Sequence, residues 1–127
     1  MEKVYNVSLV NIEVARSLLF ILSRELRENT VKIYICEALV DDVELFMREL
    51  SDNLSYEYLQ RITFEGKRNE SNIWRMLQLL KMLKLEYMMN GKAVPLVPPP
   101  VVLDFEDVVM GYVKTLLKRN PYIKEIK

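Results

Sequence analysis

Apolar residues recur with helical spacing along most of this chain, and one stretch carries them in excess. Residues 69–91 contain no proline and no glycine before Gly91, while Asn69 and Gly91 are residue types that suit the two ends of a helix. At about 100° per residue, the apolar side chains of this stretch cover nearly the whole circumference. Such a helix must be covered from several directions, so we expect it to be the buried element around which the chain is organised, covered by the other segments or by a partner subunit.

The first forty residues combine an amphipathic helical pattern with an ambiguous segment. After a short extended start, Ser8 or Asn11 can cap a helix that runs to about Asn29. In residues 30–40 apolar and polar side chains alternate as in a half-buried strand, but a helix is equally compatible with this segment. Both structures stay open here.

Residues 41–68 predict two further helices and a loop. Asp41, followed by Glu44, has the spacing of a capping box and starts a helix of about three turns. A shorter helix is expected from Ser55 and includes Ile62. Residues 66–68 then form an exposed basic loop before the long helix.

The C-terminal part changes in character. Residues 94–103 hold four prolines interleaved with aliphatic side chains, which excludes a helix and predicts an extended strap across the other elements. A last helix is expected from Asp104 to about Pro121. Together these elements predict a mainly α, single-domain fold over residues 1–127: a bundle of about four to five helices, the proline-rich strap, and at most one short strand.

Charge is balanced overall and segregated locally. The chain has 18 basic and 18 acidic residues, so no net field recruits nucleic acid or an anionic membrane. Residues 30–60 nevertheless carry a net charge of −5 and residues 61–92 one of +4. Two polarised halves of this kind can face each other or set the register of a partner.

Composition also narrows the setting. The single cysteine, Cys36, cannot form an intramolecular disulfide, the N-terminal residues do not read as a secretory signal, and no apolar run is long enough to cross a bilayer, so we expect a cytoplasmic protein. Abundant Leu, Val, Lys and Glu are compatible with a thermophilic source.

The residue types present do not favour catalysis or cofactor binding. The chain lacks histidine, its three glycines are isolated, and zinc sites built from Cys and His are excluded by count, so we expect no enzyme, no cofactor and no metal. Two minor alternatives are a metal-dependent nuclease using the Glu65-x-Lys67 spacing, and a metal site among the acidic residues 37–44. Helix capping explains the second group more simply.

Two sets of side chains are candidates for contacts with partners. A protein interface is expected on the long helix at Trp74, Met82, Met88 and Met89, because adaptable apolar side chains are in excess there. Nucleic-acid contacts are a second hypothesis for the basic pair Lys67 and Arg68.

Four segments resemble the helical domain of the GINS family, the non-enzymatic subunits of archaeal and eukaryotic replicative helicase complexes. They are Ile21–Glu28, Leu39–Leu50, Leu77–Met89 and Leu103–Asp107. The resemblance implies a helical subunit that assembles with a paralogous GINS subunit and docks onto the MCM helicase and a RecJ-like protein. It implies no catalytic residue in this chain.

The leading hypothesis is therefore a non-enzymatic helical subunit that acts in assembly, either as a homo-oligomer or with other proteins, and that resembles a GINS component of DNA replication. The alternative is a small nucleic-acid-binding regulator of viral or plasmid origin. A metal-dependent nuclease is third. No membrane association is expected.

Overall fold

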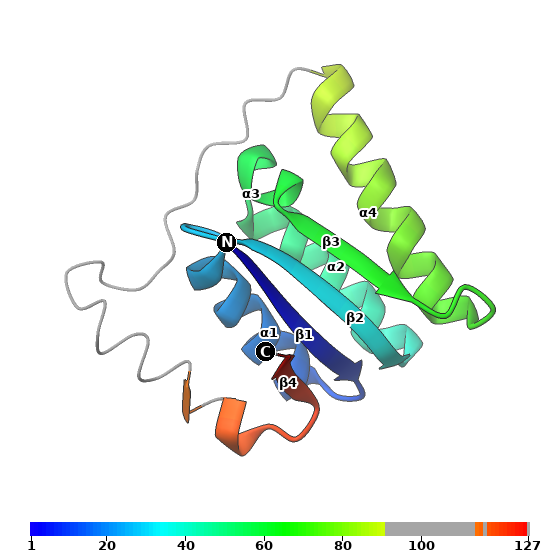
Figure 1. Cartoon of the computed structure of the whole chain (residues 1–127). Helices are drawn as coiled ribbons and strands as arrows, with labels where there is room; N and C mark the ends of the chain where they lie inside the picture. Colours follow the sequence, from blue (N-terminus) through cyan, green and yellow to red (C-terminus); the bar gives the residue numbers. More distant parts are fainter. Residues whose placement is uncertain (91–113, 116, 127) are drawn as a thin grey trace.

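The chain folds as an α/β protein, so the expectation of a mainly α helical bundle is wrong. The computed structural model describes residues 1–90, 114–115 and 117–126, and all structural statements concern these residues. Their elements, shown in Figure 1, are β1 (Glu2–Leu9), α1 (Ile12–Glu25), β2 (Thr30–Ala38), α2 (Val40–Asn53), α3 (Tyr56–Gln60), β3 (Ile62–Gly66), α4 (Ser71–Asn90) and β4 (Ile123–Ile126). Residues 114–115 and 117–119 are also helical.

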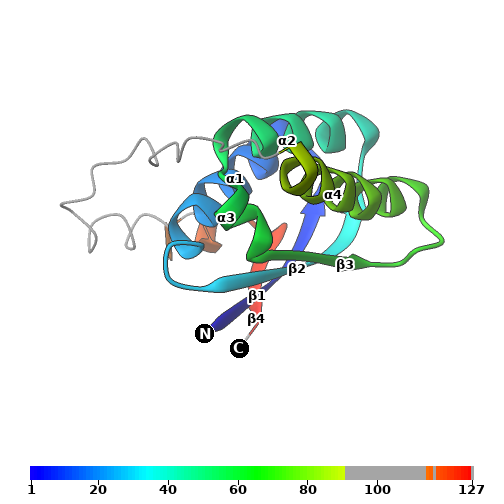
Figure 2. The ribbon, with the colours of Figure 1, turned by 90° about the horizontal axis from the view of Figure 1, so that it is seen from above.

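The four strands form one mixed sheet in the order β3-β2-β1-β4. β1, β2 and β3 run parallel, and β4 pairs antiparallel with β1. Both parallel connections step in the same direction across the sheet, and right-handed crossovers then place their helices on one face. Figure 2 shows this arrangement, with α1, α2, α3 and α4 all on the same side of the sheet.

The core lies between the sheet and this helical layer. Alternate residues of the strands point into it, because successive side chains of a strand face opposite sides. Helices α1 and α2 cover them with the apolar faces that the helical pattern predicts. The inward-facing residues of the two central strands are Tyr5, Val7, Leu9, Val31, Ile33, Ile35 and Ala38, all of which are buried.

A bulge in β2 shifts the alternation of buried and exposed side chains by one residue near the end of the strand. Val7 is paired with Ile35 but Ser8 with Glu37, so Cys36 is the extra residue. The shift brings both Ile35 and Ala38 into the core despite their odd spacing, and it leaves Cys36 exposed as a free thiol.

The local helix signals were partly correct. Asn11 is the N-cap of α1 and accepts a hydrogen bond from the Val14 amide at 2.9 Å, although the helix ends at Glu25 and not near Asn29. Ser55 caps α3 in the same way, accepting from the Tyr58 amide at 3.3 Å.

Other observed element boundaries differ from the predicted ones. The open choice at residues 30–40 is resolved as strand β2, and Ile62 belongs to β3. Helix α2 begins at Val40, with Leu39 and not Asp41 at its N-cap position. The strap at 94–103 and the start of the helix expected at Asp104 lie outside the described residues.

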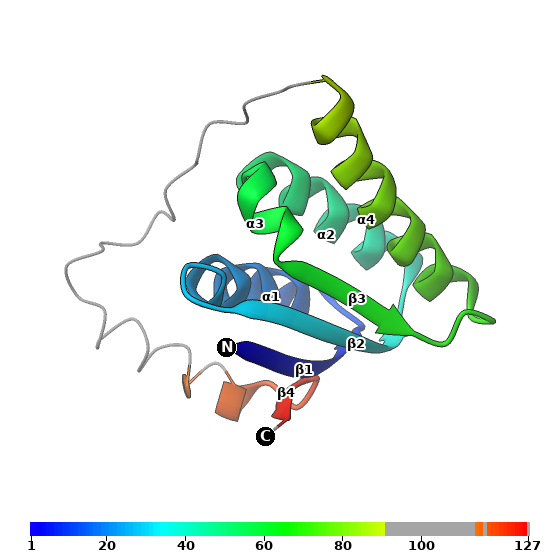
Figure 3. The same cartoon turned by 45° about the horizontal axis from the view of Figure 1, so that its top comes forward.

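The long helix is correct as an element but is not the centre of the fold. It begins at Ser71, and the preceding Glu70 carboxylate accepts hydrogen bonds from the amides of Asn72 (3.1 Å) and Ile73 (2.9 Å), in place of the expected Asn69 cap. Figure 3 shows α4 starting beside the end of β3 and running back past the start of that strand. The central position belongs to β1 and β2, each of which pairs with a strand on both sides.

Candidate functional site

The two halves of α4 lie in different surroundings. Ile73, Met76 and Leu80, on one face of its first half, are buried in the core. Beyond Leu80 the described side chains are at best partly covered, because the helix extends past the sheet that it packs on. The expectation of a wholly buried helix is therefore wrong.

An apolar stripe remains exposed along α4. It consists of Trp74, Met82, Leu85 and Met88, whose exposed fractions are 44%, 64%, 49% and 62%. These positions fall within about 120° of one another at 100° per residue, so they form one side of the helix. We refer to these four residues as the α4 stripe.

The stripe contains three of the four residues expected at a partner interface. Trp74, Met82 and Met88 are exposed there, while the side chain of Met89 lies outside the described part of the chain. Leu85 was missed. Its signal was present, since it lies three residues from both Met82 and Met88 and therefore on the same side of the helix.

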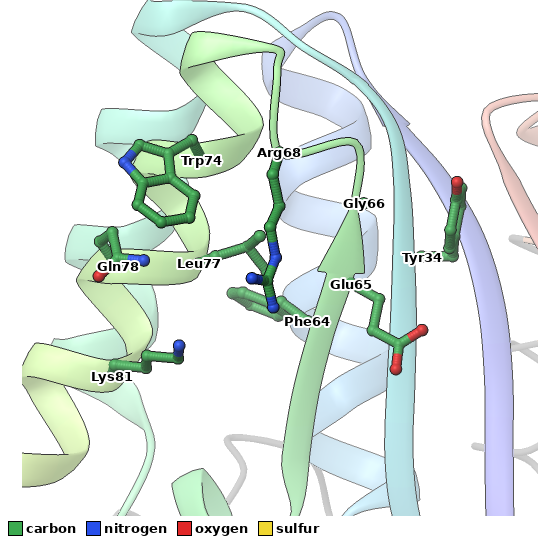
Figure 4. Close-up of a pocket in the computed structure, with 9 residues that line it drawn as sticks. All are labelled: Tyr34, Phe64, Glu65, Gly66, Arg68, Trp74, Leu77, Gln78 and Lys81. Atoms are coloured by element: carbon green, nitrogen blue, oxygen red, sulfur yellow. The ribbon is translucent and has the colours of Figure 1, made fainter.

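Beside the stripe, a groove of about 260 Å³ lies between α4 and β3. Figure 4 shows Arg68, Trp74 and Lys81 around this gap, with Leu77 and Phe64 between the helix and the strand. We refer to it as the β3 groove. Its lining residues are Tyr34, Phe64, Glu65, Gly66, Arg68, Trp74, Leu77, Gln78 and Lys81.

The apolar wall of the β3 groove is held in place by the core. Phe64 is buried, and its ring lies 6.2 Å from that of Phe46 on α2, centroid to centroid. At Gly66 the N-terminal part of α4 comes so close that an added Cβ would lie 2.5 Å from the Ile73 Cγ2 atom. The groove is therefore supported by rigid elements.

The charges around the groove are unequal. Glu65 forms an ion pair with Lys32 at 3.1 Å, so its negative charge is matched from the sheet side. Arg68 and Lys81 have no ion-pair or hydrogen-bond partner among the residues that the structure describes. The groove is consequently positive.

Lys84, a further basic residue of α4, makes a contact with the backbone of β3. Lys84 Nζ donates a hydrogen bond to the Ile62 carbonyl oxygen at 2.6 Å, and burial lowers the pKa of this ammonium group. Lysine is one of the residues with which proteins protect exposed strand edges. Lys84 thus covers the beginning of the outer edge of β3.

The expected nucleic-acid pair is separated by the fold. Arg68 lines the β3 groove, whereas Lys67 is exposed and is not one of its lining residues. The structure instead brings Lys81, from one helical turn beyond Leu77, to the same groove as Arg68. No local sequence signal links Arg68 and Lys81.

In the described part of the chain, no group of three His, Cys, Asp or Glu side chains could hold a metal ion. Glu65 of the Glu65-x-Lys67 spacing is the ion-pair partner of Lys32. Asp41 and Asp42 lie in the first turn of α2, where negative charge suits the helix dipole.

A group of polar side chains away from the β3 groove involves β1, β4 and the end of α1. The Tyr5 hydroxyl is buried with no hydrogen-bond partner in the described residues, and burial raises its pKa. Burial also raises the pKa of Glu25, whose carboxylate accepts a hydrogen bond from Asn29 at 3.2 Å. Lys3, which lowers the Glu25 pKa, forms an ion pair with Glu125 at 3.4 Å.

No family model, curated protein or solved structure matches this chain. The resemblance to the GINS family therefore stays a prediction. Within the described residues, no helix has the length and apolarity needed to span a membrane.

Proposed function

We propose that this protein is a non-enzymatic assembly module that binds another protein through the α4 stripe. The observation that carries the proposal is the exposure of Trp74, Met82, Leu85 and Met88 on one side of one helix. Met82, Leu85 and Met88 follow one another at three-residue spacing, while Gln78 and Lys81 lie between them and Trp74 on the same side of the helix. Exposed apolar side chains grouped in this way commonly mark sites of association. Trp is the residue type most enriched among the side chains that dominate binding energy, and Met adapts to the shape of a partner.

Covering the α4 stripe would supply part of the free energy of association. Covering the exposed half of one large apolar side chain contributes roughly 1 kcal/mol, so the four side chains together contribute several kcal/mol before the entropic cost of association. A helix whose second half projects beyond its own core is also accessible to a partner from more than one direction.

The proposal does not depend on the GINS resemblance. That resemblance implied a helical architecture, whereas the described residues form a four-stranded sheet, so the proposal does not extend to GINS, MCM or RecJ-like partners. A second copy of this chain and a different protein are both open as occupants of the stripe. We propose a cytoplasmic location, because the lone Cys36 is an exposed thiol of the kind that reducing compartments preserve.

The test uses Met82→Glu combined with Met88→Glu. Light scattering after size exclusion measures self-association, and a photo-crosslinking residue at position 85, introduced in cells of the source organism, reports other partners. We expect a higher-mass species or an intermolecular adduct that the double variant removes.

A matched control is Ile12→Glu with Val40→Glu. Both residues are exposed apolar side chains at the first turns of α1 and α2, away from the stripe. This control should leave association intact. A monomer that forms no intermolecular adduct from position 85 would refute the assembly function.

A further inference from the structure

The outer edge of β3 carries backbone groups that β2 does not use. The Val31 amide donates to the Arg61 carbonyl oxygen at 2.8 Å, which places the Arg61 carbonyl on the β2 side. In a parallel pair alternate residues face the neighbouring strand, so Thr63 and Glu65 also face β2, and Ile62 and Phe64 face away. The bond from Lys84 to the Ile62 carbonyl agrees with this direction.

Within the described structure, the edge is unpaired where the β3 groove begins. β3 is the outermost strand, and among the described residues it pairs only with β2. Lys84 covers the Ile62 carbonyl, but the backbone N–H and C=O of Phe64 are directed outward, next to the groove. An unpaired strand edge is a template for a further strand.

The groove adds side-chain selectivity to this edge. Trp74, Leu77 and Phe64 supply an apolar surface on the α4 side, and alternate side chains of an added strand would reach it. Arg68 and Lys81 supply two positive charges without partners in the described structure. Carboxylates of the added strand would complement both charges.

We propose that the β3 groove binds an acidic segment of a partner protein in extended conformation, which adds to the sheet as a strand at the outer edge of β3. The inference rests on the proposed interaction function and names the chemistry of one partner segment. The backbone of Phe64 provides the pairing, the apolar wall takes alternate side chains, and the Arg68 and Lys81 cations select for Asp or Glu.

A peptide fits this site better than a nucleic acid does. The outward N–H and C=O groups of Phe64 require alternating acceptors and donors, which a peptide backbone presents and a phosphate backbone does not. Binding of an oligonucleotide is therefore an outcome that would count against the proposal.

The experiment selects random peptides of about 12 residues, displayed on phage, against the full chain. Selected peptides are then synthesised, and binding is followed by the emission of Trp74, the single tryptophan of the chain. We expect peptides with Asp or Glu and alternating apolar residues, and a blue shift of the emission as the indole is covered.

Two perturbations test the mode of binding. Arg68→Glu with Lys81→Glu should weaken binding by about tenfold or more, while the matched charge reversal Lys118→Glu with Arg119→Glu, at exposed positions elsewhere, should change it little. The amides of an extended peptide form two alternating sets, and only one set can pair with β3. N-methylation of that set should weaken binding by about tenfold, and N-methylation of the other set should not.

Each contrary result overturns the proposal. These are the recovery of no acidic peptides, affinity that is insensitive to N-methylation on both sets, or a thymidine oligonucleotide that binds more tightly than the peptide and competes with it. Loss of self-association in the Arg68→Glu, Lys81→Glu variant would assign the groove to a second copy and would also overturn it. Met82→Glu with Met88→Glu should retain peptide binding, so failure at the α4 stripe and failure at the groove are distinguishable.

Discussion

Replacing Gly66 with alanine tests how closely β3, β2 and α4 are packed at the end of the groove. The added methyl group would lie 2.5 Å from the Ile73 Cγ2 atom and 2.9 Å from the Ile35 carbonyl oxygen. Both distances are shorter than van der Waals contact. The Gly66 backbone is not in the left-handed region, so alanine is conformationally allowed and the space alone decides the result.

Free space and crowding around the added methyl group predict stability changes of opposite sign. If space were available, Gly66→Ala would stabilise the protein by about 0.4–1 kcal/mol, because the unfolded chain loses conformational freedom. Crowding instead predicts a loss of about 1–3 kcal/mol, as is typical for methyl groups forced into a well-packed site. For 127 residues this loss corresponds to a fall in Tm of about 4–11 °C.

Urea denaturation and scanning calorimetry measure this change, and an unaltered urea slope would show that the two states themselves are unchanged. Thr63→Ala, at an exposed position of the same strand, is the control for a generic effect of alanine. A Tm that is equal to or higher than that of the wild type would refute the close packing of α4 on Gly66.

A double-mutant cycle with Ile73→Ala identifies the atom responsible. Ile73→Ala alone should cost about 2–5 kcal/mol, since Ile73 is a buried core residue. In the double variant the Cγ2 atom is absent, so the combined loss should be smaller than the sum of the two single losses. Strict additivity would mean that Ile73 is not what the new methyl group meets.

Two further changes test the helix signals and the buried carboxyl group. Asn11→Ala removes the side-chain acceptor of the Val14 amide and should cost about 1 kcal/mol in urea denaturation, whereas Asn11→Ser should keep most of the stability. Burial raises the folded-state pKa of Glu25, so the stability from this group is fully present at low pH and is lost as the pH rises through the raised pKa. Glu25→Gln removes that loss and can still accept the hydrogen bond from Asn29, so its Tm relative to wild type should increase as the pH rises through the raised pKa of Glu25. A pH-independent difference would show that the carboxyl group does not titrate differently on folding.

The helix caps show what a local pattern can predict. The sequence offers Ser8 or Asn11 as the N-cap of the first helix and Ser55 as the start of the short helix. In the structure Asn11 and Ser55 each accept the amide hydrogen bond from three residues later. Their interactions span one helical turn, so the information lies within a few neighbouring residues. At residues 30–40 the pattern does not decide between strand and helix, because a short apolar segment of this length fits either structure.

The strands account for most of the difference between the predicted and the observed fold. β1 reads as an alternating segment, but it was treated as a short extended start, and β3 and β4 have only 5 and 4 residues. β4 becomes a strand by pairing with β1 at the other end of the chain, as in the match of Val4 with Ile126. Such pairing is not encoded in the neighbours of either segment.

The sequence by itself determined the apolar excess of the long helix, the start of the short helix at Ser55 and the absence of histidine chemistry, and it left Asn11 as one of two candidates for the first N-cap. Only the tertiary structure decided that one half of α4 covers the sheet while Met82, Leu85 and Met88 project beyond it. It also decided that Arg68 and Lys81 meet at the outer edge of β3. The reason is physical: helical hydrogen bonds and caps link residues that are close in sequence, whereas burial and strand pairing depend on segments that only folding brings together.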